Sequence, residues 1–251
     1  VDCIMTSPPY WALRDYGTEG QLGLEPTFNE YISKLCDIFD EAKRVLKDTG
    51  TCWVNIGDTY SATRWTNNEN SGQPMNKFKD GWRGINPIKD TGNIPDKCLV
   101  MIPFRFAIEM VNRGWILRNT IIWHKPNCMP SSVKDRFTVD FEYVFFFVKQ
   151  KKYYFDAQYE KQTTMKTEDR LSGHRAWDND PTLQRGAGEG SIMKYNPLGR
   201  NKRTVWQICP QPFPEAHFAV YPEELCETPL KSGCPEFVCV KCGKAREKVY
   251  D

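Results

Sequence analysis

A short apolar run at the start of the chain ends in four residues whose types could support chemistry. Val1–Thr6 has the composition of a buried strand, and Ser7-Pro8-Pro9-Tyr10 follows at once. The two prolines end the strand and leave the carbonyls of Ser7 and Pro8 without a partner in a ladder. Such acceptors beside the flat ring of Tyr10 suit an unstacked base that carries an exocyclic amino group. We expect Ser7, Pro8 and Tyr10 to meet at the carboxyl end of a central parallel strand, where open α/β sheets bind ligands.

The same residues carry a resemblance to a known family. The segment TSPPYWALRDYG (6–17) resembles the catalytic motif of DNA methyltransferases that modify exocyclic amino groups, and WHKPN (123–127), SVKDR (132–136) and EYVFFF (142–147) are also similar to this family. The Ser-Pro-Pro-Tyr form is more typical of cytosine N4 enzymes than of adenine N6 enzymes. The resemblance therefore implies cytosine N4 as the target, with adenine N6 as the alternative. Taken alone, SPPY could also be a proline-terminated strand before an ordinary loop.

The resemblance implies a catalytic motif made of Ser7, Pro8, Pro9 and Tyr10. Ser7 and the Pro8 carbonyl would accept the two amino hydrogens, and Tyr10 would stack on a base flipped out of double-stranded DNA. The methyl donor would be S-adenosylmethionine, as in the site-specific enzymes of restriction-modification systems. The Pro-Cys dipeptide expected of ring-carbon cytosine enzymes does not occur in the sequence. Protein-glutamine methyltransferases usually carry Asn at the position of Ser7, so the serine argues against that class of enzyme.

A later stretch resembles the family's approach to the donor pocket. His217, Phe218, Tyr221 and Pro222 lie in a segment that, by resemblance, precedes a helix flanking that pocket, and they are the candidate cofactor-binding residues. The family places a glycine-rich donor loop after this segment, and the 251 residues contain no match to it. We therefore expect the 251 residues alone to be inactive. Gly186–Gly190 follows a polar segment rather than an apolar strand, which argues against a nucleotide-binding loop there.

Three cysteines near the end of the chain are candidate metal ligands. Cys239 and Cys242 form a Cys-x-x-Cys pair followed by Gly and Lys, and Cys234 could be a third ligand. Structural zinc takes four ligands, so a fourth would have to come from elsewhere. A surface turn with free thiols is the alternative. A function of another class also follows: a non-catalytic nucleic-acid-binding module held by a zinc ribbon and basic loops.

The periodicity of apolar residues predicts alternating strands and helices. A strand, a helix and a second strand at the start of the chain predict a right-handed crossover between parallel strands. The expected fold class is α/β, a Rossmann-like S-adenosylmethionine-dependent methyltransferase sheet without its donor-loop half. By resemblance, the last long strand inserts antiparallel beside its neighbours. Helices are expected at 28–47 and 96–112, and strands at 1–6, 51–56, 115–123, 140–149 and 203–208.

The same pattern suggests four parts. They are a catalytic half (1–149), a target recognition region (150–203), a segment flanking the donor pocket (204–233) and the start of a zinc-ribbon-like insertion (234–251). A solvated surface excursion is the alternative for 150–203. Within the catalytic half, the polar segment 59–96 would suit either DNA contact or a solvated loop.

Composition sets weaker limits. The chain has 251 residues, a formal net charge of +2 and 40% apolar residues, so it can build a core and permits a DNA partner without arguing for one. No apolar run approaches the ~20 residues of a membrane span, and no signal peptide is recognisable. We expect a cytoplasmic protein whose ten cysteines form no disulfide framework. The oligomeric state is left open.

Overall fold

The computed structural model describes residues 1–13, 18–61, 90–161, 198–211 and 220–246. These residues fall into two compact units, 1–156 with 204–251 and, separately, 157–203. The helices are α1 (Phe28–Val45), α2 (Ile102–Asn112) and α4 (Glu223–Gly233). The strands are β1 (Cys3–Thr6), β2 (Thr51–Ile56), β3 (Ile116–His124), β4 (Phe141–Val148), β5 (Tyr159–Glu160), β6 (Arg200–Asn201) and β7 (Val205–Gln207).

The first unit is built on a mixed five-stranded sheet in the order β1-β2-β4-β3-β7. β1 runs parallel to β2, and β7 runs parallel to β3, while β4 is antiparallel to both of its neighbours. The expected parallel pair and the antiparallel insertion are therefore confirmed. One expectation is wrong: within the described sheet β1 is an edge strand rather than a central one. β4 follows β3 in the sequence but lies between β2 and β3 in the sheet, and β7 lies at the other edge, next to β3.

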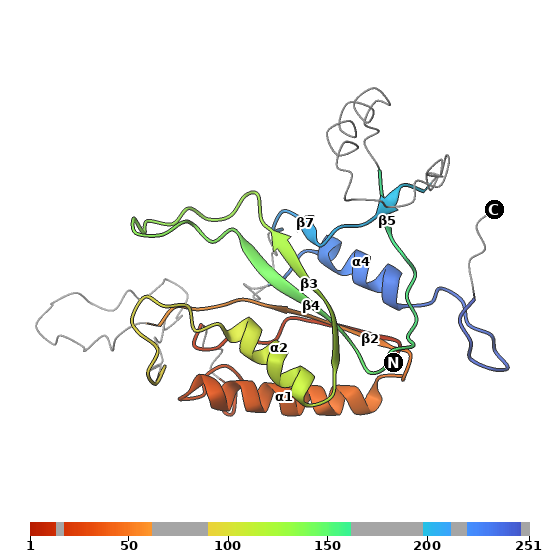
Figure 1. The fold of residues 1–251 in the computed structure, drawn as a ribbon, viewed down its shortest axis with the longest axis horizontal. Helices are drawn as coiled ribbons and strands as arrows, with labels where there is room; N and C mark the ends of the chain where they lie inside the picture. Colours follow the sequence, from red (N-terminus) through yellow and green to blue (C-terminus); the bar gives the residue numbers. More distant parts are fainter. Residues whose placement is uncertain (14–17, 62–89, 162–197, 212–219, 247–251) are drawn as a thin grey trace, which may run out of the picture. The chain divides into compact units, whose positions relative to one another are not determined.

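The sheet is buried on both faces because its side chains alternate between two apolar clusters. One cluster takes Cys52, Val54 and Ile56 of β2 together with residues of α1 and α2. The other takes Trp53 of β2, Leu225 of α4 and three residues of β4, Val144, Phe146 and Val148. α1 and α2 accordingly lie on one side of the sheet and α4 on the other, as Figure 1 shows. This three-layer arrangement confirms the expected α/β class.

α1 begins at the residue that the sequence predicts, whereas α2 begins later than predicted. Thr27 precedes α1, and its side-chain oxygen accepts a hydrogen bond from the Glu30 amide. The second helix was expected from residue 96 but begins at Ile102. Residues before it pair with the segment after β2, through a bridge between Tyr60 and Leu99. This pairing, with Pro103 in the first turn, explains why the apolar pattern of 96–101 is not helical.

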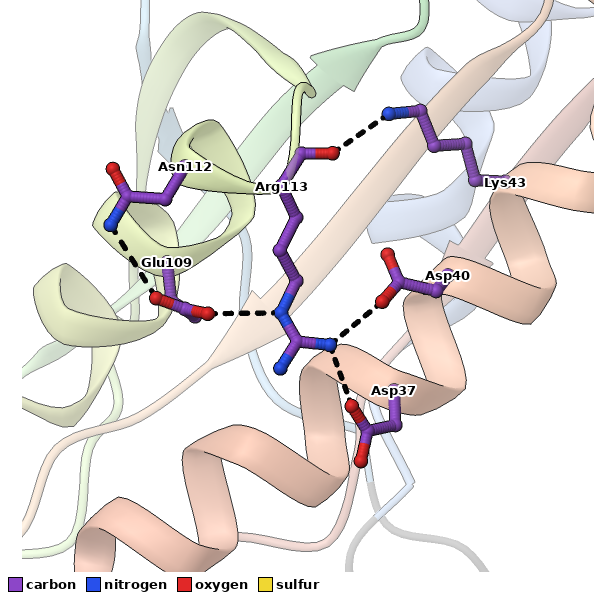
Figure 2. Close-up of polar contacts among 6 residues, drawn as sticks. All are labelled: Asp37, Asp40, Lys43, Glu109, Asn112 and Arg113. Carbon is purple, nitrogen blue, oxygen red and sulfur yellow. Dashed lines mark hydrogen bonds and ion pairs between the residues drawn. The ribbon is translucent and has the colours of Figure 1, made fainter.

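One arginine joins the two helices on that side of the sheet. Arg113, at the end of α2, places its guanidinium between Asp37 and Asp40 of α1, at 2.6 and 2.7 Å, and also contacts Glu109 at 2.9 Å (Figure 2). Its carbonyl accepts a hydrogen bond from Lys43 of α1 at 2.9 Å. Both ends of this one residue therefore attach α2 to α1.

The second unit contains the two-stranded antiparallel pair of β5 and β6. Arg200 and Arg203 both contact the carboxylate of Glu160, at 2.8 and 2.7 Å. Two basic residues near the end of the predicted recognition region are thus paired with a carboxylate of the same unit. Most of the segment 150–203 lies outside the described residues, so its proposed role stays a prediction.

Candidate functional site

The Ser-Pro-Pro-Tyr turn follows β1 directly, as the sequence predicts. Ser7 and Tyr10 are half-buried, and Pro8 is buried. The carbonyl of Pro9 accepts a hydrogen bond from the Tyr31 hydroxyl of α1 at 2.9 Å. The turn is therefore fixed to α1 at the carboxyl end of β1, beside the end of β2.

Tyr10 reaches from this turn across the end of the sheet. Its hydroxyl donates to Glu142 Oε2 at 2.6 Å and lies 3.2 Å from Asn55 Oδ1. Asn55 belongs to β2, which lies next to β1, and Glu142 belongs to β4. The side chain that the sequence assigns to base stacking is thus attached by its polar end to two further strands.

The ring of Tyr10 also lies against the backbone at Gly57. A Cβ atom at Gly57 would come within 2.7 Å of Tyr10 Cε2, closer than such atoms approach in real structures. Only glycine lets the ring lie at this position without displacement. The residue therefore supports one side of the ring at the carboxyl end of β2.

The environment of Tyr10 keeps its phenol neutral. Burial raises the pKa of Tyr10 well above its ordinary value, and the nearby charge of Glu142 and its hydrogen bond raise it further. A hydrogen bond with Ser7 acts on the pKa in the opposite direction, which places Ser7 and Tyr10 in contact. At neutral pH the hydroxyl is consequently a donor.

A cation completes the cluster around Glu142. Lys125 Nζ forms an ion pair with Glu142 Oε1 and lies 4.2 Å from the centre of the Trp123 ring. Asn55 Nδ2 donates to Glu142 Oε2 and to the Tyr143 carbonyl, at 3.1 Å each. Both oxygens of this partly buried carboxylate are thus engaged by donors.

Sequence reasoning singled out the Ser-Pro-Pro-Tyr motif but assigned no role to its partners Asn55, Gly57, Lys125 and Glu142. Two signals were present. Asn55 is a polar residue in the otherwise apolar run of β2, and Lys125 and Glu142 lie in the segments that resemble the family. Neither signal identifies the contact with Tyr10, because Asn55 and Glu142 are 45 and 132 residues away from Tyr10 in the sequence.

The candidate donor-binding residues are only partly described. His217 and Phe218 lie outside the described residues. Pro222 is buried immediately before α4, and Tyr221 packs against the cluster that contains Leu225. Burial raises the pKa of Tyr221, and the Cys226 thiol beside it adds to this effect. The predicted helix start after Pro222 is confirmed, while donor binding by these residues stays a prediction.

The three candidate metal ligands do not come together. Cys239 and Cys242 lie in one turn, where backbone N–H groups of Cys242 and Lys241 lower the pKa of Cys239. Cys234 instead follows α4 and lies beside Cys3 of β1. No group of three or more possible metal ligands occurs among the described residues. Cys234 is placed by the packing of α4 on β1, and the described residues give the pair Cys239 and Cys242 no third ligand, so zinc binding by these cysteines stays a prediction.

The fold and the site together define a class. It is an α/β protein in which a Ser-Pro-Pro-Tyr turn lies at the carboxyl end of two parallel strands, β1 and β2. The family model described as DNA methylase matches residues 1–240, and the chain belongs to that family. The resemblance seen in the sequence is therefore confirmed.

Individual relatives agree with this family. Over 236 residues the chain is 38% identical to the type II methyltransferase M.SmaI of Serratia marcescens, covering 92% of this chain and 68% of that protein. It is 40% identical over 225 residues to the type II methyltransferase M.Cfr9I of Citrobacter freundii, covering 90% of this chain and 63% of the relative. The chain thus spans about two thirds of the length of these two relatives.

The fold is also similar to a solved structure, PvuII DNA methyltransferase (cytosine-N4-specific). The TM-score is 0.52 at 17% identity, over 93% of this chain and 63% of the other. This likeness concerns the fold alone.

The comparisons do not bear out the expectation that the 251 residues are inactive by themselves. Among the described residues, no helix is long and apolar enough to cross a membrane.

Proposed function

We propose that this chain carries the acceptor side of an S-adenosylmethionine-dependent DNA methyltransferase that modifies the exocyclic N4 of cytosine. The observation that carries the proposal is the half-buried Tyr10, which joins the Ser-Pro-Pro turn to the ends of β2 and β4. The relatives named as type II methyltransferases support the activity, and the similar fold of PvuII DNA methyltransferase (cytosine-N4-specific) is compatible with the target.

The acceptor side works by position rather than by a nucleophile. The target base leaves the stack, and Tyr10 stacks on it, which contributes about 1–3 kcal/mol in comparable base–aromatic contacts. Ser7 and the Pro8 carbonyl accept the amino hydrogens and orient the nitrogen lone pair. S-adenosylmethionine supplies an electrophilic methyl group on a sulfonium sulfur. The amino nitrogen gains that carbon as the carbon–sulfur bond breaks, and it then releases one proton to water.

The fit to the two substrates is unequal in the described residues. On the acceptor side a neutral phenol, a hydroxyl and backbone carbonyls match an aromatic base with an amino group. On the donor side the candidate residues are Tyr221 and Pro222, together with His217 and Phe218 outside the described residues. We propose that the donor lies between these two sets.

The recognised DNA is double-stranded, and 150–203 is the proposed recognition region. Within this region the guanidinium groups of Arg200 and Arg203 pair with the carboxylate of Glu160. Contacts to DNA phosphates would therefore have to come from other cations or break this pairing. The module of another class, a zinc ribbon without catalysis, has less support because the described cysteines supply only two neighbouring ligands.

The choice of cytosine N4 over adenine N6 depends on Ser7, whose neutral hydroxyl suffices if the amino group needs only orientation. The test is to methylate DNA with the complete protein, digest it to nucleosides and analyse these by mass spectrometry. We expect N4-methylcytosine. N6-methyladenine without N4-methylcytosine would overturn the target and keep the amino-methyltransferase, whereas neither product would overturn the proposed function.

A further inference from the structure

We propose that Glu142, together with Lys125, is a positioning residue that holds the ring of Tyr10 in the orientation that receives the flipped base. This inference rests on the proposed function. It assigns a task to a carboxylate that never has to touch the base, the methyl donor or the reacting nitrogen.

The two oxygens of Glu142 serve different partners. Oε2 accepts from Tyr10 at 2.6 Å and from Asn55 at 3.1 Å, while Oε1 pairs with Lys125. The distance to Tyr10 is that of a strong O–H···O bond to a charged acceptor. The phenol is therefore bonded to an acceptor that is itself fixed from a second direction.

Lys125 has a clear reason to be present. The side chains of Glu142 and Lys125 are each only 20% exposed, and a carboxylate this far removed from water requires a cation or several donors. Lys125 supplies the cation from the end of β3, while its position over Trp123 limits where its amino group can lie. The pair thus provides a charged acceptor at a defined place.

A second, independent contact restricts the same ring. Gly57 lies against the ring edge of Tyr10, where even a Cβ would collide at 2.7 Å. The hydroxyl is held at one end and the ring carbons are supported from the side. A ring restrained in both ways is pre-organised, so the base meets an aromatic face without further ordering of the protein.

Pre-organisation predicts a specific pattern of defects. Losing the tether should slow methyl transfer, because the base is then stacked in several orientations of which few are reactive. It should not weaken binding to the duplex, which depends on phosphate contacts. A purely structural role for Glu142 predicts the reverse: a lower melting temperature with an unchanged transfer rate well below that temperature.

The test is a double-mutant cycle between Tyr10→Phe and Glu142→Gln in the complete protein. Phe keeps the ring and removes the hydroxyl, and Gln keeps the size and removes the charge. We expect each change to slow single-turnover transfer roughly tenfold, and the double variant to be no slower than roughly tenfold, with the DNA dissociation constant unchanged. Glu41→Gln, a surface glutamate paired with Arg44, is the matched control and should leave the rate unchanged.

The outcomes separate the two claims. An unchanged rate in Glu142→Gln, or a roughly hundredfold loss in the double variant, would overturn the positioning role alone. Absence of any transfer by the wild-type protein would overturn the proposed function, and the positioning role with it. Melting temperatures measured on the same samples identify variants whose rate falls only because they unfold.

Discussion

Tyr10 uses its two chemically different parts for two different purposes. Its hydroxyl is bound inside the protein by Glu142 and Asn55, and its ring is the proposed surface for a base. A tyrosine rather than a phenylalanine is explained by the first contact, and an aromatic residue by the second. The neighbouring Gly57 is explained by the space that the ring occupies.

Replacing Tyr10 with Ala should reduce methyl transfer much more than DNA affinity. The change removes a stack of about 1–3 kcal/mol, so a loss of roughly tenfold to a hundredfold in the single-turnover rate is expected. Phosphate contacts that hold the duplex are untouched. Rates and dissociation constants should be measured on one DNA, and equal losses in both would contradict the stacking role.

Replacing Gly57 with Ala should displace the ring without unfolding the protein. The new Cβ would lie 2.7 Å from Tyr10 Cε2, so the ring has to move. We expect a slower transfer rate with a melting temperature close to that of the wild type. Gly92→Ala is a contrasting control, since nothing lies within 4 Å of a Cβ there, although its φ of +58° adds local strain. A wild-type transfer rate in Gly57→Ala would show that the close contact is unimportant.

At the scale of elements, the start of α2 is set by a side chain outside the helix. Asp58, just after β2, accepts hydrogen bonds from the amides of Met101 and Ile102, at 3.1 and 3.0 Å. Burial raises the pKa of this carboxyl, while its backbone donors act to lower it. The residue before the helix, Met101, has a φ of +62° and no capping side chain of its own. The cap therefore comes from the segment that follows β2.

Replacing Asp58 with Ala should lower the free energy of unfolding by about 1 kcal/mol, because two amides at the helix start lose their acceptor. Urea unfolding followed by circular dichroism measures this difference. Asp58→Asn keeps an acceptor oxygen and should cost less. An Ala variant as stable as the wild type would mean that water replaces the carboxylate without loss.

At the scale of the whole sheet layer, α1 and α2 are joined by apolar packing and by Arg113. Its guanidinium contacts three carboxylates while its side chain is only 21% exposed. Hydrogen bonds to Asp37 and Glu109 raise the pKa of Arg113 further, so it stays charged at every practical pH. Removing it would leave a cluster of negative charges between the two helices.

Replacing Arg113 with Met should destabilise the protein by about 1–2 kcal/mol, a value reduced by the partial exposure of the carboxylates. The loss should shrink when Asp37 and Asp40 are also changed to Asn, because the repulsion then disappears. Arg44→Met, which removes a surface pair with Glu41, should have an effect near zero. Equal effects of the two arginine changes would contradict a special role for the cluster.

The buried thiols and phenols make stability depend on alkaline pH. Burial raises the pKa of Cys3 and of Cys36 to about 12, and it raises that of Cys52 and Tyr31 as well. Above about pH 9 the unfolded chain releases protons that the folded chain retains. The contribution of these groups to the free energy of unfolding should therefore be constant between about pH 6 and 8 and fall as pH rises beyond 9.

The contribution of two of these thiols can be isolated. Each buried thiol adds up to about 1.4 kcal/mol per pH unit to this fall, so the Cys36→Ala, Cys52→Ala double variant should show a shallower slope between pH 9 and 10.5. Urea titrations at several pH values give the slope independently of the baseline stability. A slope equal to that of the wild type would mean that other groups cause the fall.

The sequence by itself determined the local elements and the chemistry of the turn. Short apolar runs predicted the strands of the sheet, the helical spacing of apolar residues predicted that α1 begins at residue 28, and two prolines ended β1 beside Tyr10. These features depend on neighbouring residues, whose φ preferences and periodicity are visible in a short window. The family resemblance of the same turn was equally readable.

The tertiary structure decided which distant residues meet. β4 enters between β2 and β3, so Glu142 reaches a tyrosine 132 residues away, and β1 is left at the edge. The packing of α4 on β1 places Cys234 beside Cys3 rather than beside Cys239 and Cys242. The bridge between Tyr60 and Leu99 precedes α2, which begins only at Ile102. Strand order and helix packing follow from the burial of whole faces, and no local window contains that information.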